Sequence, residues 1–168
     1  MRTKIIITFL LLFSIRMTAQ EQGHVSLHAD AAYGTDVKGP GVGGSVLYGF
    51  TEHLRGSIGY RYFFKKNAMR MHNLAFDVQW LIPLESQFSV YPVAGLVLTN
   101  VRYDGKLPQR QDGGSMKAVE TETKLGGMIG LGAEYMLSGH IGIHLQGGYQ
   151  MVKTHGQGVF DIGIGYRF

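Results

Sequence analysis

The stretch Asn73-Leu-Ala-Phe-Asp-Val-Gln-Trp-Leu-Ile82 alternates large apolar side chains with mostly small or polar ones. One set consists of Leu74, Phe76, Val78, Trp80 and Ile82, and the other of Asn73, Ala75, Asp77, Gln79 and Leu81. Successive side chains of a β-strand point to opposite faces, whereas a helix would group its apolar residues three or four positions apart. This stretch therefore predicts a β-strand with one strongly apolar face.

The same alternation occupies most of the chain after the first two dozen residues. Seven further segments carry it, at residues 25–33, 42–50, 57–64, 88–100, 125–135, 141–151 and 160–168. The segment 88–100 is the least regular, because Pro92 lacks the N–H that a strand ladder uses, and a bulge or a locally open pair is expected there. With 168 residues there is room for one domain. The sequence predicts an all-β protein, an antiparallel up-and-down β-barrel of about eight strands.

The two faces of these segments indicate where such a barrel belongs. In a water-soluble barrel the apolar face turns inward, and glycine with a few charges would form the exterior. The chain has 25 glycines and only 17% charged residues, a poor composition for a soluble surface. With the apolar face turned outward, the aromatic and aliphatic side chains meet lipid, and the polar face fills a narrow lumen. The barrel is therefore predicted to span a membrane.

The predicted lumen carries charges that can neutralise one another. Its expected polar network consists of His28, Asp30, Arg61, Asp77, Glu134, His144, Asp161 and Arg167. Because this filling leaves little open space, bulk passage of solutes is not expected. The outward aromatics expected near the membrane interfaces are Tyr33, Trp80, Tyr103, Tyr135, Tyr166 and Phe168.

The first residues have the form of an export signal. Arg2 and Lys4 precede an apolar run from Ile5 to Ile15, and Ala19 is a small residue at the expected cleavage point. The apolar run is shorter than the roughly 20 residues that a spanning helix needs, which disfavours a retained anchor. We predict a cleavable signal peptide at residues 1–19 and a barrel domain at residues 20–168.

Charge and cysteine content exclude several classes of function. Of the 16 Lys and Arg residues, Arg2, Lys4 and Arg16 lie in the predicted signal, so 13 remain against 12 Asp and Glu. The mature protein is then nearly neutral, and its basic isoelectric point is no indication of nucleic-acid binding. The absence of cysteine excludes a disulfide scaffold and a cysteine-ligated metal.

The connections between the predicted strands alternate in length, as those of outer-membrane barrels do. Those near residues 51–54, 83–87 and 137–139 are short, whereas the alternate set includes one long loop, residues 103–116. The long set and its flanks carry ten Lys or Arg and five Asp or Glu. Its main basic residues are Lys65, Lys66, Arg70, Arg102, Lys106 and Arg110. Lipid and the anionic phosphates of lipopolysaccharide are the partners expected at this rim. Loop charges that are only solvated by water are an equally open interpretation.

Two groups of residues have some of the chemistry of a site. His28, Asp30, His144 and Asp161 share the polar face on strands that should be neighbours, so they could bind a metal or transfer protons. Their spacing matches no known ligand motif, and polar filling of the lumen is the favoured interpretation. His24 and Ser26 have the His-x-Ser form of lipid A deacylases, but they lie in the wrong part of the barrel. No metal, cofactor or catalytic residue is predicted.

The end of the chain, from Gly158 to Phe168, resembles the C-terminal signature of bacterial outer-membrane barrels. The residues that match it are Phe160, Ile162, Ile164, Tyr166 and Phe168. Together with residues 91–100, they make the chain similar to the eight-stranded OmpX-like and opacity-like barrels and to the OmpA transmembrane domain. The resemblance implies an outer-membrane location and transient binding of the last strand by the barrel-assembly machinery.

The resemblance specifies architecture better than activity, because this group hosts several functions. The favoured function is non-enzymatic: a structural or surface-interaction role in the bacterial envelope, possible protein partners being unknown. The alternatives are a lipid-modifying enzyme, either an acyltransferase or a deacylase, and an accessory subunit of a secretion or assembly complex. A soluble ligand-binding barrel is the rival fold.

Overall fold

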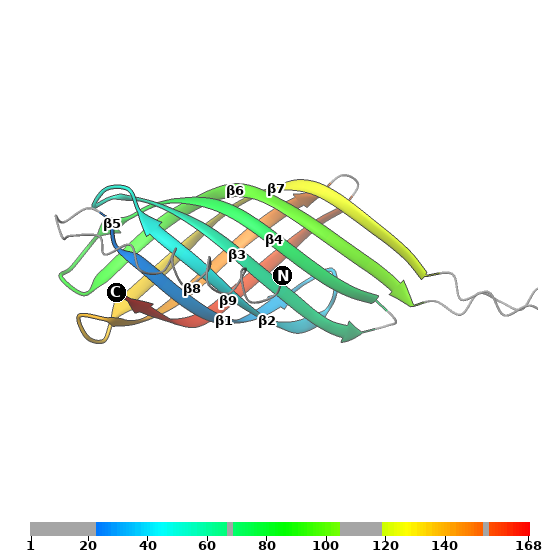
Figure 1. Ribbon diagram of the computed structural model, residues 1–168, viewed down its shortest axis with the longest axis horizontal. Helices are drawn as coiled ribbons and strands as arrows, with labels where there is room; N and C mark the ends of the chain where they lie inside the picture. Colours follow the sequence, from blue (N-terminus) through cyan, green and yellow to red (C-terminus); the bar gives the residue numbers. More distant parts are fainter. Residues whose placement is uncertain (1–22, 67–68, 105–118, 153–154) are drawn as a thin grey trace, which may run out of the picture.

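Antiparallel strands close on themselves to form the barrel that the alternation predicts (Figure 1). The computed structural model describes residues 23–66, 69–104, 119–152 and 155–168. Its strands are β1 (Val25–Gly34), β2 (Gly39–Gly49), β3 (Leu54–Lys66), β4 (Met69–Trp80), β5 (Ile82–Pro83), β6 (Phe88–Asp104), β7 (Val119–Met136), β8 (Ile141–Val152) and β9 (His155–Arg167). Consecutive strands pair, β1 pairs with β9, and pairing of β4 with β6 completes the ring. Within these ranges no helix has the length and apolar character needed to cross a membrane.

The short strand β5 continues β4, and the two are separated by a break in pairing opposite Pro92. Gln79 pairs with Val93 on β6, and Ile82 pairs with Val90 in the same register. The pairing is interrupted between these two points, opposite Pro92, which has no N–H to donate. On its other side the chain stays attached at this point, because the N–H of Leu81 donates to the carbonyl oxygen of His53, which precedes β3, at 2.6 Å. The locally open pair expected from Pro92 is confirmed. When β4 and β5 are counted as one strand, the described wall of the barrel has eight strands.

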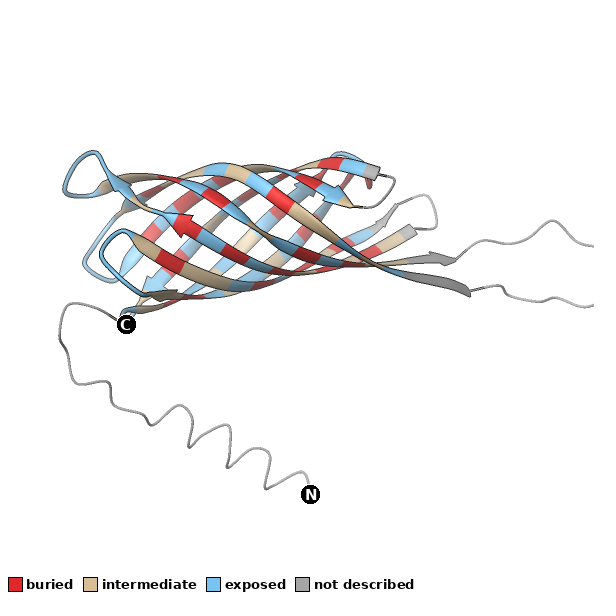
Figure 2. Cartoon of the chain, turned by 90° about the horizontal axis from the view of Figure 1, so that it is seen from above, coloured by how far each residue is buried: buried red, intermediate tan, exposed pale blue. Residues whose placement is uncertain are grey.

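Burial alternates along the strands in the sense that a membrane requires (Figure 2). On β9, Ile162 is 61% exposed, whereas the neighbouring Asp161 is 4% exposed. The same exposure of large apolar side chains recurs on the other strands, for example at Phe76 and Ile143. A soluble barrel would have these side chains inside, so the predicted inversion is confirmed.

The two ends of the barrel differ. The turn end carries the tight connections at residues 50–53, 84–87 and 137–140, together with the start of β1 and the end of β9. The loop end carries the connections that follow β1, β3, β6 and β8. Short turns mark the periplasmic side of outer-membrane barrels, which assigns the loop end to the cell exterior.

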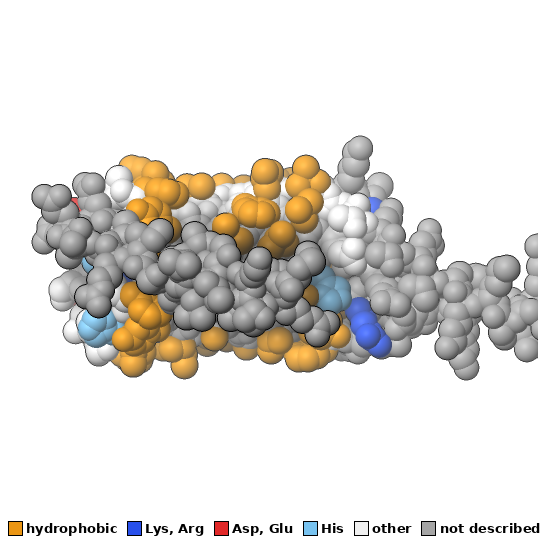
Figure 3. All heavy atoms as spheres, viewed as in Figure 1, with side chains coloured by type: hydrophobic (Ala, Val, Ile, Leu, Met, Phe, Trp, Pro, Cys, Tyr) orange, Lys and Arg blue, Asp and Glu red, His pale blue; other side chains and the backbone are white. Residues whose placement is uncertain are grey.

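The outer wall presents an apolar surface, part of which is visible in Figure 3. Aromatic residues lie toward both of its ends. Exposed aromatics at the turn end are Trp80, Tyr135, Tyr166 and Phe168, and those toward the loop end are Tyr33 and Phe64. The rings of Tyr166 and Phe168 meet edge to face at 5.0 Å. Of the predicted interface aromatics, the side chain of Tyr103 lies outside the described residues. Rings at two levels fit the two boundaries of a bilayer.

The inverted arrangement predicts a depth-dependent cost for a new charge. Ile162→Arg, in the middle of β9, should lower the unfolding free energy in lipid vesicles by about 2–4 kcal/mol. Leu84→Arg is the matched control, because Leu84 is 58% exposed against 61% for Ile162 but lies in a turn. Urea unfolding followed by tryptophan fluorescence measures both. Equal, small effects of the two substitutions would contradict burial of the wall in lipid.

Candidate functional site: the barrel lumen

The interior of the barrel is crossed by a buried ion pair between non-neighbouring strands. The Arg61 guanidinium on β3 donates from Nε and Nη2 to the two carboxylate oxygens of Asp161 on β9, at 2.9 and 2.8 Å. Both side chains are nearly inaccessible to solvent. Such a two-point contact fixes the geometry of both groups and compensates for their loss of hydration. The pair therefore links two parts of the wall that β1 and β2 separate.

A second charged group lies nearer the turn end. Arg55 contacts the Glu134 carboxylate at 2.5 Å, and Arg167 approaches the other oxygen of that carboxylate at 3.5 Å. Arg55 also donates to Gln79, and its guanidinium lies 5.0 Å from the ring centre of Tyr91. Arg55 was not among the predicted lumen residues, because the segment expected from the alternation begins at residue 57. The even spacing from Arg61 was the signal that could have placed Arg55 on the inner face.

Two histidines and an aspartate come together across the closure of the barrel. Nε2 of His144 on β8 lies 2.6 Å from Oδ1 of Asp30 on β1, with β9 between them. The His28 ring stacks on the His144 ring at 4.3 Å between centres. On the intervening strand, a Cβ at Gly163 would meet both Asp30 and His144, and one at Gly165 would meet His28. These glycines leave the space that the three side chains occupy.

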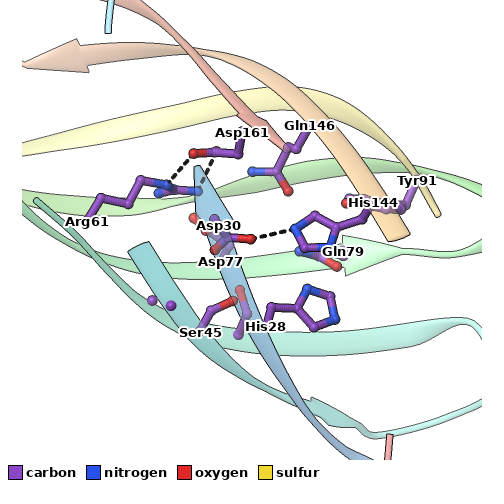
Figure 4. Close-up of a pocket in the computed structure, with 13 residues that line it drawn as sticks. His28, Asp30, Ser45, Arg61, Asp77, Gln79, Tyr91, His144, Gln146 and Asp161 are labelled. Atoms are coloured by element: carbon purple, nitrogen blue, oxygen red, sulfur yellow. Dashed lines mark hydrogen bonds and ion pairs between the residues drawn. The ribbon is translucent and has the colours of Figure 1, made fainter. Parts of the chain in front are cut away.

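Between these groups lies a cavity of ≈ 20 Å³, about the space that one water molecule needs (Figure 4). His28, Asp30, Arg61, Asp77, His144 and Asp161 contribute to its lining. Asp77 is 6% exposed, and its Oδ1 atom has no hydrogen-bond partner among the described residues. Two of the expected lumen carboxylates form ion pairs: Asp161 with Arg61, and Glu134 with Arg55 and Arg167. In the described part of the chain, no direct ion pair joins Asp77 to a basic side chain.

Toward the loop end the lumen is filled by amides and then by apolar side chains. The Gln150 Oε1 atom accepts from Asn73 at 3.1 Å and from Gln157 at 2.8 Å. Beyond this group lies an apolar plug of Ala32, Val37, Phe63, Met71 and Val159. The expectation that the inner face is polar throughout was therefore incomplete. Phe63 and Met71 lie on the inward parity of their strands, and that parity was the available signal.

The remaining predicted residues fall into three groups. The terminal set Phe160, Ile162, Ile164, Tyr166 and Phe168 is exposed on the outer wall. Of the predicted rim residues, Arg70 is half-buried. The backbones of Lys65, Lys66 and Arg102 lie in strands, but their side chains are outside the described part of the structure. Lys106, Arg110 and the predicted signal peptide lie outside the described residues. Ser26 is buried inside the barrel wall and His24 is exposed near the turn end, so this pair does not face outer-leaflet lipid.

The Arg61–Asp161 pair makes a prediction that a mutant cycle tests. Asp161→Leu alone leaves a buried guanidinium without its partner and should lower the unfolding free energy by about 3–5 kcal/mol. The double variant Arg61→Met, Asp161→Leu removes both charges and should be more stable than that single variant. Urea unfolding in the same detergent measures all of them. Additive losses would show that the two side chains do not act as a pair.

Comparisons with known proteins agree with this geometry. The family model described as "outer membrane protein beta-barrel domain" matches residues 5–168. The N-terminal barrel of Pseudomonas aeruginosa OprF is 17% identical, with a TM-score of 0.71 over 89% of this chain and 100% of that one. Neisserial surface protein A is 18% identical (TM-score 0.66, 87% and 97% covered), and Yersinia pestis Ail is 14% identical (0.62, 88% and 99%).

No curated protein matches the chain. At these identities the solved structures show the fold alone, but the family model covers nearly the whole sequence. The inverted wall and the antiparallel closure of the barrel agree with that description. The chain therefore belongs to the outer membrane protein β-barrel domain family and is a small bacterial outer-membrane barrel.

Proposed function

We propose that this protein is a non-enzymatic barrel with a filled lumen, which has a structural or surface-interaction role in the bacterial envelope. The observation that carries the proposal is that side chains fill the interior along its length. Ion pairs at Glu134 and Asp161, the amides around Gln150 and the apolar plug follow one another along the axis. With eight strands the interior is only wide enough for such side chains, so the barrel contributes a wall and a set of displayed loops.

The position of Ser26 argues against the deacylase alternative. A lipid-modifying enzyme needs its nucleophile on the outward face, within reach of the acyl chains of the outer leaflet. Ser26 instead lies on the inner side of β1, 8% exposed. The group with the most concentrated polar chemistry, around His144 and Asp30, is likewise inside the barrel and away from lipid. These placements support a role without catalysis on lipid.

A filled lumen predicts that the protein does not conduct sugars. Liposomes containing the refolded protein should not swell in solutions of sugars small enough to pass a general porin, because the ion pairs and the plug block the axis. Vesicles with the same amount of a porin serve as the positive control. Swelling at a rate comparable to that of the porin would overturn the filled-lumen proposal.

The rim of the loop end favours an anionic surface partner, which we propose to be lipopolysaccharide. The register of β4 and β6 places Arg70 opposite Arg102. Two arginines at directly opposed positions concentrate positive charge at the loop end, and a phosphate group accepts hydrogen bonds from guanidinium groups. Lys65 and Lys66 end the neighbouring strand β3 at the same end of the barrel.

Neutralising these two arginines should weaken retention of lipopolysaccharide. The double variant Arg70→Gln, Arg102→Gln lowers the net charge by two at the loop end. The control is the double variant His53→Glu, Ser86→Glu, which lowers the net charge by the same amount at exposed positions of the turn end. Lipopolysaccharide that co-elutes with the barrel from gel filtration is measured at low and high salt. The first pair should reduce retention at low salt and the second should not. Equal retention by both would contradict the proposed rim site.

A further inference from the structure

Three side chains with metal-binding atoms converge inside the barrel. One ligand atom each from His28, Asp30 and His144 lies within 4.8 Å of the other two. Two strands that are not hydrogen-bonded to each other supply them, with His28 and Asp30 on β1 and His144 on β8. His144 and Asp30 are oriented toward each other beside the central cavity (Figure 4). This convergence depends on closure of the barrel.

We propose that His28, Asp30 and His144 form a site for a divalent transition-metal ion of the Zn²⁺ class. Two imidazole nitrogens and one carboxylate oxygen are a ligand set that zinc takes in proteins, with a fourth position for water or a further ligand. Imidazole donors disfavour Ca²⁺ and Mg²⁺, which prefer oxygen ligands. The sequence favoured simple polar filling because the spacing of these residues matches no local motif, but the ligands come from distant strands.

The surroundings of the site carry more negative than positive charge. Three carboxylates line the cavity, those of Asp30, Asp77 and Asp161, together with one guanidinium, that of Arg61. With neutral imidazoles, this layer has an excess of two negative charges. The nearest other guanidinium in the described part of the lumen, that of Arg55, is engaged with Glu134. A divalent cation would neutralise the cavity, which a water molecule would not.

Asp77 is a second and independent indication of a ligand. Its side chain lines the cavity, and its Oδ1 atom is buried without a hydrogen-bond partner in the described ranges. A buried carboxylate oxygen normally has a donor or a cation beside it. In the proposed site Asp77 is an outer-shell residue, which accepts a hydrogen bond from a metal-bound water.

Formation of the site requires one of the two imidazole rings to turn. The stacked rings of His28 and His144 differ by 24° in plane, and one of them must turn for both nitrogens to face a common ion. His28 can do so because its ring makes no hydrogen bond within the described residues and faces Gly165, which has no side chain. Metal binding replaces the His144–Asp30 contact with two metal bonds, and the link from β1 to β8 is kept.

The test uses the full mature protein, refolded in detergent without a polyhistidine tag and freed of metal by a chelator. Equilibrium dialysis against Zn²⁺ with metal analysis gives the stoichiometry, and Co²⁺ absorption in the visible range reports the ligand geometry. We expect one ion per barrel and a stabilised barrel in urea. His28→Gln and His144→Gln should each abolish stoichiometric binding. Asp77→Asn should weaken it by about 10–100-fold, the effect of losing an outer-shell partner.

His140→Gln is the matched control, because His140 is an exposed histidine in a turn at the same end of the barrel as the β1 start. It should leave the stoichiometry unchanged. His28→Gln keeps the test decisive if His144→Gln does not fold, since His28 makes no hydrogen bond that folding would miss. The proposal of a metal site would be overturned if the protein binds no Zn²⁺, or if the folded His28→Gln variant still binds it. The His144–Asp30 contact would then be an ordinary polar pair beside a water-sized cavity. The filled-lumen proposal is tested separately by sugar flux.

Discussion

The structure depends on the inability of lipid to accept or donate a hydrogen bond. Every backbone group in the wall must pair with a neighbouring strand, which forces the sheet to close, as it does where β1 meets β9 and β4 meets β6. The same constraint sends polar side chains to the only other surface, the interior. Eight strands leave that interior so narrow that a charge such as Arg61 has no bulk water available. It must find a partner on another strand, and it finds Asp161.

Glycine makes this crowded interior possible. Large lumen side chains lie directly against glycines of the neighbouring strands: the Tyr91 ring occupies the space where Gly132 would carry a Cβ, and the Asp77 carboxylate does so at Gly95. A β-strand normally loses stability through glycine. At these two positions the loss is offset, because the missing side chain makes room for one that closes the lumen. Glycine is there a packing feature of the inner face.

The sequence predicted the wall well and the interior only in part. The outward faces follow from alternation within single strands, such as Phe76 with Val78, and lipid enforces that alternation strictly. The plug of Phe63 and Met71 was missed because a lumen accepts apolar as well as polar residues, so composition does not constrain the inner face. Contacts such as Arg55 with Glu134 join strands far apart in the chain. They depend on the register of every strand between them and on where each one begins, which alternation does not determine.

The kind of side chain that fills the interior also changes along the axis. The change follows the two sides of the membrane, the periplasm and the cell exterior. Paired charges and histidines occupy the turn end and the centre, whereas amides and then the apolar plug occupy the loop end. Water can approach the charged layers from the periplasm, where Arg167 remains about one-third accessible. The plug around Phe63 closes the side that faces the environment. The barrel wall alone would satisfy the hydrogen bonds of the backbone. The layered filling occupies the axis in addition, which supports the proposal of a surface role over one in transport along the axis.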